Sequence, residues 1–279
     1  MSLITANPTR ISRRFAELSE RGELGIVAYI TAGDPSLDAT LQFVLALDEA
    51  GADVIELGVP FSDPLADGPT IQRASERALK SGTTLRGVID LVHRIRRLSE
   101  VPLVLFSYYN PILQMGLDHF ASSAAAAGVD GVLATDLTPE EAHEYRRVLA
   151  EHHLDTIFLA APTSTEQRLN SITACTSGFL YLISRTGVTG AREMLPEDLP
   201  ALIRRVRRST ELPIAVGFGI SQPGHVSVLG GLVDAAVVGS ALVAEIERAG
   251  GEAGEALRAK IGALKRAARS GLSRREAVP

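Results

Sequence analysis

The chain has 279 residues, of which 46% are hydrophobic and 22% charged, a composition too apolar for a disordered protein. Its formal net charge is -5 and no basic patch with interleaved aromatic residues occurs, which argues against nucleic-acid binding. The single cysteine, Cys175, excludes an intramolecular disulfide and fits a reducing compartment. No apolar run suits a membrane span or a signal peptide. A cytoplasmic location is therefore expected.

Short apolar runs recur along the chain at intervals that suit strand–helix units. Eight strands are predicted, at residues 24–30, 54–57, 103–107, 131–134, 156–159, 179–183, 214–216 and 235–238. Helical patterns occupy residues 37–50, 85–98, 139–152, 199–208 and 242–249, with an extra helix near 254–269. This alternation predicts a single (β/α)8 TIM barrel over residues 1–279, with a frayed tail at 270–279. A doubly wound open sheet is the alternative.

Two carboxylates stand eleven residues apart around the second predicted strand. Glu56 lies within an apolar run, where desolvation raises the pKa of a carboxyl group. Asp67 lies in a loop of prolines and glycines, which is typical of a segment that folds over a substrate. The pair predicts general acid–base chemistry. The competing interpretation is that Glu56 is a structural carboxylate paired with an arginine and that Asp67 only forms a turn.

Glycines follow the late strands, at the face of a barrel that carries function. Gly219 follows the seventh strand, Gly239 and Ser240 follow the eighth, and Gly190 follows the sixth. Backbone N–H groups and helix N-termini at such loops commonly hold a phosphate. The alternative is that these glycines only permit tight strand-to-helix turns.

Other reaction types lack the residues that they need. The three lysines lie in helical stretches rather than at strand ends, which disfavours a Schiff base. The histidines lie on or near predicted helices, so no metal site is expected. Neither a Walker loop nor a dinucleotide fingerprint occurs. Cofactor-free acid–base chemistry by Glu56 and Asp67 on a phosphorylated substrate remains.

Long motifs carry a family resemblance from about residue 24 to residue 249. They read Tyr-Ile-Thr-Ala-Gly-Asp-Pro at 29–35, Glu-Leu-Gly-Val-Pro-Phe-Ser-Asp-Pro-Leu-Ala-Asp-Gly-Pro-Thr-Ile-Gln at 56–72, Tyr-Tyr-Asn-Pro-Ile at 108–112, Ser-Arg-Thr-Gly-Val-Thr-Gly at 184–190, Gly-Phe-Gly-Ile-Ser at 217–221 and Gly-Ser at 239–240. With these motifs the chain resembles the tryptophan synthase alpha chain family.

The resemblance implies a barrel that splits indole-3-glycerol phosphate into indole and glyceraldehyde 3-phosphate by retro-aldol chemistry. It implies no cofactor in this chain, and a beta subunit with pyridoxal phosphate that receives the indole in an alpha2-beta2 assembly. Three rivals remain: another phosphate-binding barrel such as an isomerase, a subunit that chiefly activates its partner, and a free-standing indole-releasing lyase.

The same resemblance assigns roles to single residues. Glu56 matches the proton donor to the indole ring carbon and the base for the glycerol hydroxyl. Asp67 matches the carboxylate that accepts the indole N–H, and Thr189 matches the residue that orients it. Indole-site and cavity-lining positions are Tyr29, Phe106, Tyr108, Thr135, Leu159 and Tyr181. The phosphate-binding positions are Gly190, Gly219, Gly239 and Ser240.

Overall fold

The computed structural model describes residues 8–183 and 199–270. Within them, nine parallel strands form one sheet in the order β5-β4-β3-β2-β1-β9-β8-β7-β6. The strands are β1 (Gly25–Thr31), β2 (Val54–Gly58), β3 (Leu103–Ser107), β4 (Gly131–Ala134), β5 (Asp155–Ile157), β6 (Leu159–Ala160), β7 (Leu180–Ile183), β8 (Ile214–Gly217) and β9 (Ala235–Val238). Every predicted strand is present within a residue or two of its expected bounds.

The barrel closes through its fifth strand. Strands β5 and β6 are two halves of that single predicted strand, separated by Phe158. The first half pairs with β4 and the second with β7, and the N–H of Tyr181 donates to the carbonyl of Phe158 at 3.2 Å. One run of chain therefore joins both edges of the sheet. The prediction of a barrel is confirmed, and the open-sheet alternative is wrong.

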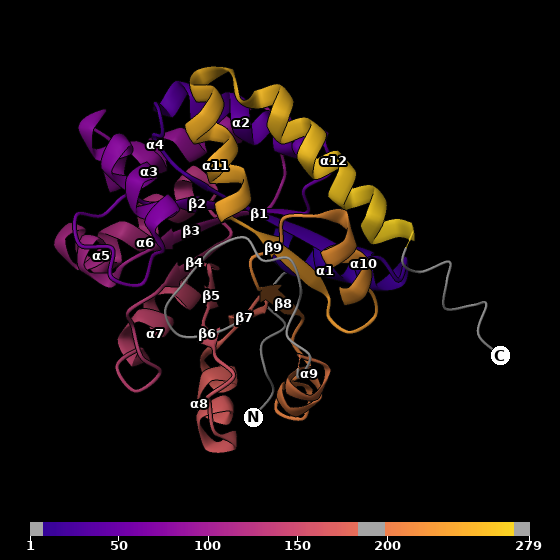
Figure 1. The fold of residues 1–279 in the computed structure, drawn as a ribbon. Coiled ribbons are helices and arrows are strands. Elements are labelled where there is room, and N and C mark those ends of the chain that lie inside the picture. The colour runs from indigo at the N-terminus through magenta and orange to yellow at the C-terminus, as the bar shows by residue number, and fades with distance from the viewer. Residues whose placement is uncertain (1–7, 184–198, 271–279) are drawn as a thin grey trace.

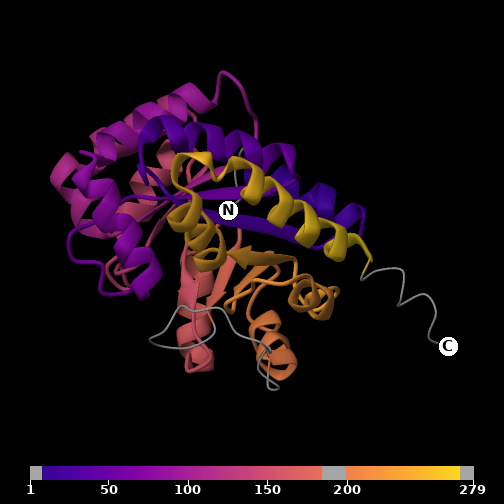
Figure 2. The ribbon, with the colours of Figure 1, turned by 45° about the horizontal axis from the view of Figure 1, so that its top comes forward.

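Helices surround the sheet in Figures 1 and 2. They are α1 (Arg10–Glu20), α2 (Leu37–Glu49), α3 (Pro69–Lys80), α4 (Leu85–Ile95), α5 (Tyr109–Met115), α6 (Leu117–Ala127), α7 (His143–Glu151), α8 (Glu166–Cys175), α9 (Leu199–Arg207), α10 (Pro223–Leu229), α11 (Ser240–Ala249) and α12 (Gly254–Ser270). Helix α12 packs along α2. The helix expected from residue 139 begins only at His143, because Pro139 accepts a turn bond from Ala142 instead.

Side chains alternate between two hydrophobic layers along each strand, as the strand period of two requires. One set packs outward against the helices. The other fills the barrel and includes Val27, Val54, Val104 and Leu133. Of the described helices, none is both long and apolar enough to cross a membrane.

Helix α1 closes the amino-terminal end of the barrel. Its buried residues Ile11, Phe15 and Leu18 join the interior layer, and the rings of Phe15 and Phe179 lie 5.6 Å apart. Helix α1 therefore covers the apolar interior at this end, and a pocket lined in part by Phe15, Leu18, Pro213 and Asp234 lies beside it.

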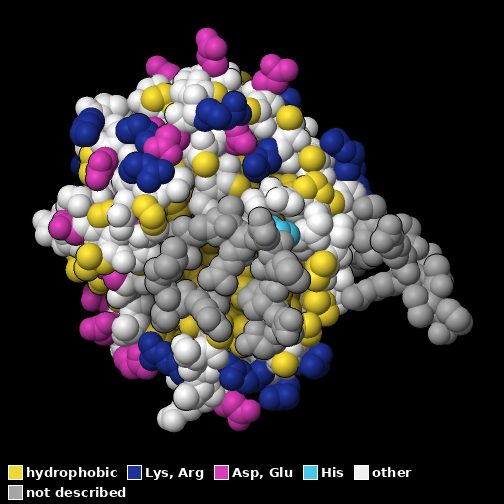
Figure 3. All heavy atoms as spheres, in the orientation of Figure 1, with side chains coloured by type: hydrophobic (Ala, Val, Ile, Leu, Met, Phe, Trp, Pro, Cys, Tyr) yellow, Lys and Arg dark blue, Asp and Glu magenta, His cyan; other side chains and the backbone are white. Residues whose placement is uncertain are grey.

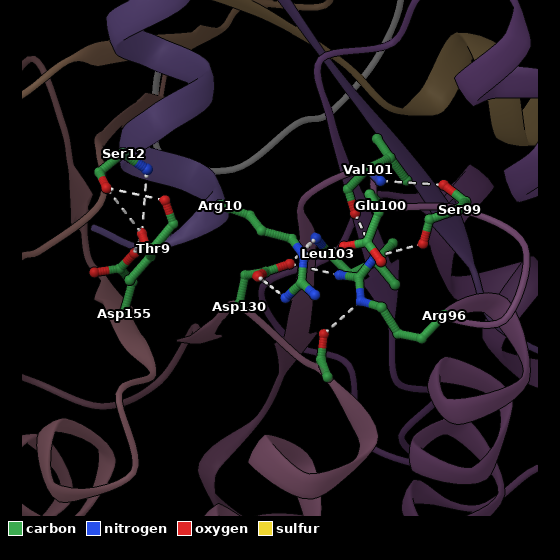
Figure 4. A network of polar contacts seen from close by, with 11 residues as sticks. Thr9, Arg10, Ser12, Arg96, Ser99, Glu100, Val101, Leu103, Asp130 and Asp155 are labelled. Atoms are coloured by element: carbon green, nitrogen blue, oxygen red, sulfur yellow. Dashed lines mark hydrogen bonds and ion pairs between the residues drawn. The ribbon is translucent and has the colours of Figure 1, made fainter. Parts of the chain in front are cut away.

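A polar network around Asp130 fixes α1 to the strands (Figure 4). Arg96 and Arg10 donate to the Asp130 carboxylate at 2.6 and 3.1 Å, and the N–H of Leu103 donates to it at 2.8 Å. Thr9, at the N-cap of α1, donates to Asp155 at 2.6 Å. The carboxyl-terminal end of the strands, called the mouth of the barrel, lies opposite.

Candidate active site

Glu56 lies inside the barrel because it shares a face of β2 with Val54, which belongs to the interior layer, while Ile55 and Leu57 face the helices. Its neighbours across the sheet are Tyr29 on β1 and Val104 on β3. The residue is fully buried, and neither carboxyl oxygen has a hydrogen-bond partner among the described residues. Burial raises the pKa of Glu56 to about 8. The carboxyl group therefore holds its proton at neutral pH, and no described arginine supports the structural interpretation.

An aromatic wall surrounds this carboxyl group. The rings of Tyr29 and Phe106 meet edge to face, with centroids 5.2 Å apart, and Tyr181 on β7 pairs with Leu159 on β6. All four predicted side chains point into the barrel. Such a wall suits a flat aromatic ligand.

Two glycines make room for the tyrosine hydroxyls in this wall. A Cβ atom on Gly58 would lie 2.2 Å from the hydroxyl of Tyr29, and one on Gly217 would lie 2.8 Å from the hydroxyl of Tyr181. Atoms cannot approach so closely, so any larger residue at either position would displace the tyrosine. The shape of the wall thus depends on glycine at the ends of β2 and β8.

Asp67 lies in the loop between β2 and α3, where Tyr108 holds it. The N–H of Ala66 donates to the Tyr108 hydroxyl at 2.9 Å, and the Gln72 side chain donates to the Asp67 carbonyl at 2.8 Å. Burial raises the pKa of the Asp67 carboxyl to about 6, although a hydrogen bond from Tyr108 opposes the shift. Asp67 is therefore mostly ionised at neutral pH, but less firmly than a solvated aspartate.

The hydroxyl of Thr135, which follows β4, is buried without a hydrogen-bond partner in the described part of the chain. An unsatisfied buried hydroxyl is costly, so Thr135 marks a place where a polar group of a ligand would fit. Thr31, the last residue of β1, interacts with the Tyr29 hydroxyl. Thr31 is not among the predicted positions, although it shares a face of β1 with Val27 and Tyr29, which places it inside the barrel.

Three of the four predicted phosphate positions, Gly219, Gly239 and Ser240, follow the ends of the neighbouring strands β8 and β9. Gly219 has φ 68° in the loop after β8, while Gly239 and Ser240 begin α11. The N–H groups of Leu242 and Val243 both bond to the Gly239 carbonyl, so the helical bonds begin at that residue. The N–H groups of Ser240 and Ala241 accordingly have no backbone partner among the described residues, and at such a helix start the helix dipole also favours an anion.

Two predicted positions, Thr189 and Gly190, lie outside the described residues. In residues 8–183 and 199–270, no group of three or more His, Cys, Asp or Glu side chains could hold a metal ion.

A carboxyl group kept protonated by burial inside a TIM barrel, one loop away from an ionised carboxylate, defines a barrel enzyme of the acid–base type.

Known proteins identify the family. Residues 15–270 match the family model for the tryptophan synthase alpha chain. The tryptophan synthase alpha chain of Solibacter usitatus is 56% identical over 240 residues, which cover 86% of this chain and 90% of the relative. That of Citrifermentans bemidjiense is 52% identical over 258 residues, covering 92% and 97%.

Solved structures agree. Tryptophan synthase of Mycobacterium tuberculosis superposes with a TM-score of 0.87 at 37% identity, covering 94% of this chain and 99% of that one. The alpha subunit of Legionella pneumophila gives 0.88 at 36% identity, with the same coverage. The chain belongs to the tryptophan synthase alpha chain family. It is a lyase of tryptophan biosynthesis that cleaves indole-3-glycerol phosphate to indole and glyceraldehyde 3-phosphate, and the indole passes to a beta subunit. The isomerase alternative is wrong.

Proposed function

We propose that Glu56 and Asp67 are the acid–base pair of this cleavage. Glu56, protonated because of its burial, donates its proton to C3 of the indole ring and converts the ring into a leaving group. It then takes the proton of the glycerol hydroxyl next to that carbon. The bond between the ring and the glycerol chain breaks, its electron pair returns to the ring, and the hydroxyl carbon becomes the aldehyde. Glu56 ends as it began, so no other reactant is needed.

One observation carries this proposal: Glu56 is fully buried with both oxygens unpartnered in the described residues. A buried carboxyl group without a hydrogen-bond partner destabilises the empty protein. The same isolation tunes its pKa to the range in which a group both gives and takes a proton.

Asp67 complements it by staying ionised. Protonation of the ring carbon leaves positive charge on the indole nitrogen, and a carboxylate that accepts the N–H stabilises that charge. The Tyr108 hydroxyl favours the ionised form of Asp67. The two carboxyl groups thus take different roles because their surroundings give them different pKa values.

The rest of the substrate would lie across the mouth. We assign the indole ring to the wall of Tyr29, Phe106, Leu159 and Tyr181, and polar atoms of the substrate to the Thr135 hydroxyl. The phosphate would bind to backbone N–H groups around Gly219, Gly239 and Ser240. Residues 217–221 and 239–240 contain no lysine or arginine, so the backbone and the helix dipole supply the attraction.

The partner would dock beside the Asp67 loop. We propose a cytoplasmic alpha2-beta2 assembly in which the beta subunit holds pyridoxal phosphate and this chain uses no cofactor. Leu65, on that loop, is 93% exposed and Leu113 on α5 is 50% exposed. The rings of Phe61 and Tyr108 link the loop to the start of α5 at 5.0 Å. Docking on these side chains would hold the loop and so align Asp67.

The test is indole formation from indole-3-glycerol phosphate, measured with and without saturating beta subunit. Glu56→Gln should lose nearly all cleavage while it still binds the substrate, because the amide keeps the volume but cannot shuttle a proton. Glu151→Gln, an exposed residue of α7, is the control and should match the wild type. A Glu56→Gln rate above about a tenth of the wild-type rate would refute the assignment. Equal wild-type rates with and without partner would favour a free-standing lyase.

A further inference from the structure

Helices α3 and α11 lie side by side on the barrel (Figure 1). Helix α3 begins at Pro69, directly after the Asp67 loop, and α11 begins at Ser240, in the proposed phosphate seat. Each helix therefore carries one of the two polar ends of the site at its own start. The distance between those ends depends on how the two helices pack.

Near their starts the helices pack through apolar side chains. Ile71 and Ala74 of α3 and Val243 of α11 form a buried cluster with Tyr29. Apolar contacts of this kind hold the helices together by close packing. Directional contacts define the register further.

Ion pairs supply those contacts farther along the two helices. Arg73 donates to both carboxylate oxygens of Glu247, at 2.7 and 2.9 Å, and Arg77 donates to Glu247 at 3.0 Å. Basic and acidic side chains stand side by side over this part of the molecule in Figure 3. Hydrogen bonds from Arg73, with Arg77 adding to them, lower the pKa of Glu247 to about 2. Glu247 is therefore ionised at neutral pH, and both arginines face a negative charge.

Arg77 also reaches a third element. Its guanidinium makes two parallel bonds of 2.8 Å to the carboxylate of Asp34, whose side chain is only 2% exposed. Asp34 lies in the loop after β1, the strand that carries Tyr29 and Thr31. One side chain thus joins α3, α11 and the end of β1, and the paired geometry fixes direction as well as distance.

A simple surface salt bridge would look different. Arg94 of α4 and Asp38 of α2 also join two neighbouring helices, at 2.6 Å, but their side chains are 44% and 84% exposed. Such exposed pairs contribute little to stability. Asp34 is instead removed from water, which is costly unless the pairing is well made. The pair of Arg77 with Asp34 is therefore of the kind that specifies geometry, and the bond from Arg77 to Glu247, whose side chains are 32% and 33% exposed, extends it to α11.

We propose that Arg77 is a positioning residue, which sets the separation between the Asp67 carboxylate and the phosphate seat by holding α3 to α11 and to the loop after β1. This inference depends on the proposed function, because it takes both ends of the substrate from it. A substrate that must touch both ends at once is sensitive to their spacing, and a shift of about 1 Å can lower a rate by about 100-fold. A ligand that touches only one end is not.

The experiment compares a ligand that spans both ends with one that fills a single end. The spanning probe is 3-(indol-3-yl)propyl phosphate, titrated by calorimetry, and the single-ended probe is inorganic phosphate, titrated by phosphorus NMR. Arg77→Lys keeps a positive charge near Asp34 but cannot make the paired bonds and reach Glu247. Compared with wild type, Arg77→Lys should raise the Kd of the spanning probe about 10-fold and lower kcat about 10-fold. The Kd for inorganic phosphate should stay within about twofold of the wild-type value.

Two further variants complete the design. Glu247→Gln breaks the bridge at α11 without stranding a buried charge, so it should fold, and it should raise the Kd of the spanning probe alone by about threefold or more. Arg94→Lys, the matched change in the exposed pair, should alter neither probe. The inference is wrong if the spanning probe binds to Arg77→Lys and Glu247→Gln as it binds to Arg94→Lys, or if both probes weaken equally. If wild type binds no phosphate, the proposed site fails instead.

Discussion

Replacing Glu56 with glutamine should stabilise the protein relative to wild type by an amount that grows as the pH rises. The same change should abolish cleavage. In the unfolded chain Glu56 ionises near pH 4.5, whereas in the folded chain its pKa is about 8. Between these values the folded protein holds one more proton than the unfolded chain. Its free energy of unfolding therefore falls by about 1.4 kcal/mol for each pH unit. Below pH 4.5 both states are protonated and above pH 8 both are ionised, so the slope vanishes outside this window.

The glutamine variant lacks this slope, because an amide does not titrate. Its unpaired amide costs the same at every pH, and the other titrating groups, Asp67 included, are common to both proteins. The variant should therefore gain about 3 kcal/mol in unfolding free energy relative to wild type between pH 5 and pH 7. Urea unfolding followed by circular dichroism at pH 5, 6, 7 and 8 measures this difference, with Glu151→Gln as the control.

The reasoning fails if the difference between the variant and the wild type is independent of pH. That result would mean that Glu56 ionises at its ordinary pH in the folded protein. Glu56 would then be solvated or paired with a cation, and it could not serve as the proton donor at neutral pH. If the difference in unfolding free energy shrinks as the pH rises, the pKa of Glu56 is lowered in the folded protein and not raised.

Three further outcomes are expected. The profile of kcat/KM against pH should be a bell with limbs near pH 6 and pH 8, because Asp67 must be ionised and Glu56 protonated. Steady-state assays measure this profile. An acidic limb that survives in Asp67→Asn would contradict the assignment of that limb to Asp67. Asp130→Ala should lower the free energy of unfolding by about 3–5 kcal/mol, because it leaves the buried guanidinium of Arg96 without its carboxylate. In the folded variant KM should be unchanged. An altered KM with unchanged stability would show that Asp130 acts on the site and not on the scaffold. Gly58→Ala should raise KM by about 10-fold or more, since the new methyl group would lie 2.2 Å from the Tyr29 hydroxyl; an unchanged KM would show that the ring is free to move.

The strands could be predicted from the sequence because they are apolar on both faces and end at glycine or polar residues. The break at Phe158 could not, since it arises where one strand changes partners, which no local pattern encodes. Helix α1 was also missed. Ile11, Phe15 and Leu18 recur with helical spacing, but the polar residues between them led the N-terminal segment to be interpreted only as lacking a signal peptide.

Some properties of the site could likewise be predicted from the sequence and others could not. The burial of Glu56 follows from alternation along β2, so its raised pKa could be predicted. The pKa of Asp67 could not, because it depends on how its loop packs on Tyr108, far along the chain. The bridge from Arg77 to Asp34 was invisible for the same reason: it needs the packing of three elements, which sequence spacing does not give.

Because α1 covers the amino-terminal end of the barrel, contacts that stabilise the fold lie apart from residues that would select the substrate. Asp130 lies directly before β4, at the amino-terminal end of the strands, whereas Asp67, Gly219 and Ser240 follow the carboxyl-terminal ends of β2, β8 and β9. We expect substitutions in the loops after the strands to leave the ion pairs of Asp130 in place. We expect stabilising substitutions around α1, in turn, to leave turnover unchanged. Directed evolution of this barrel can therefore treat its two ends as independent libraries.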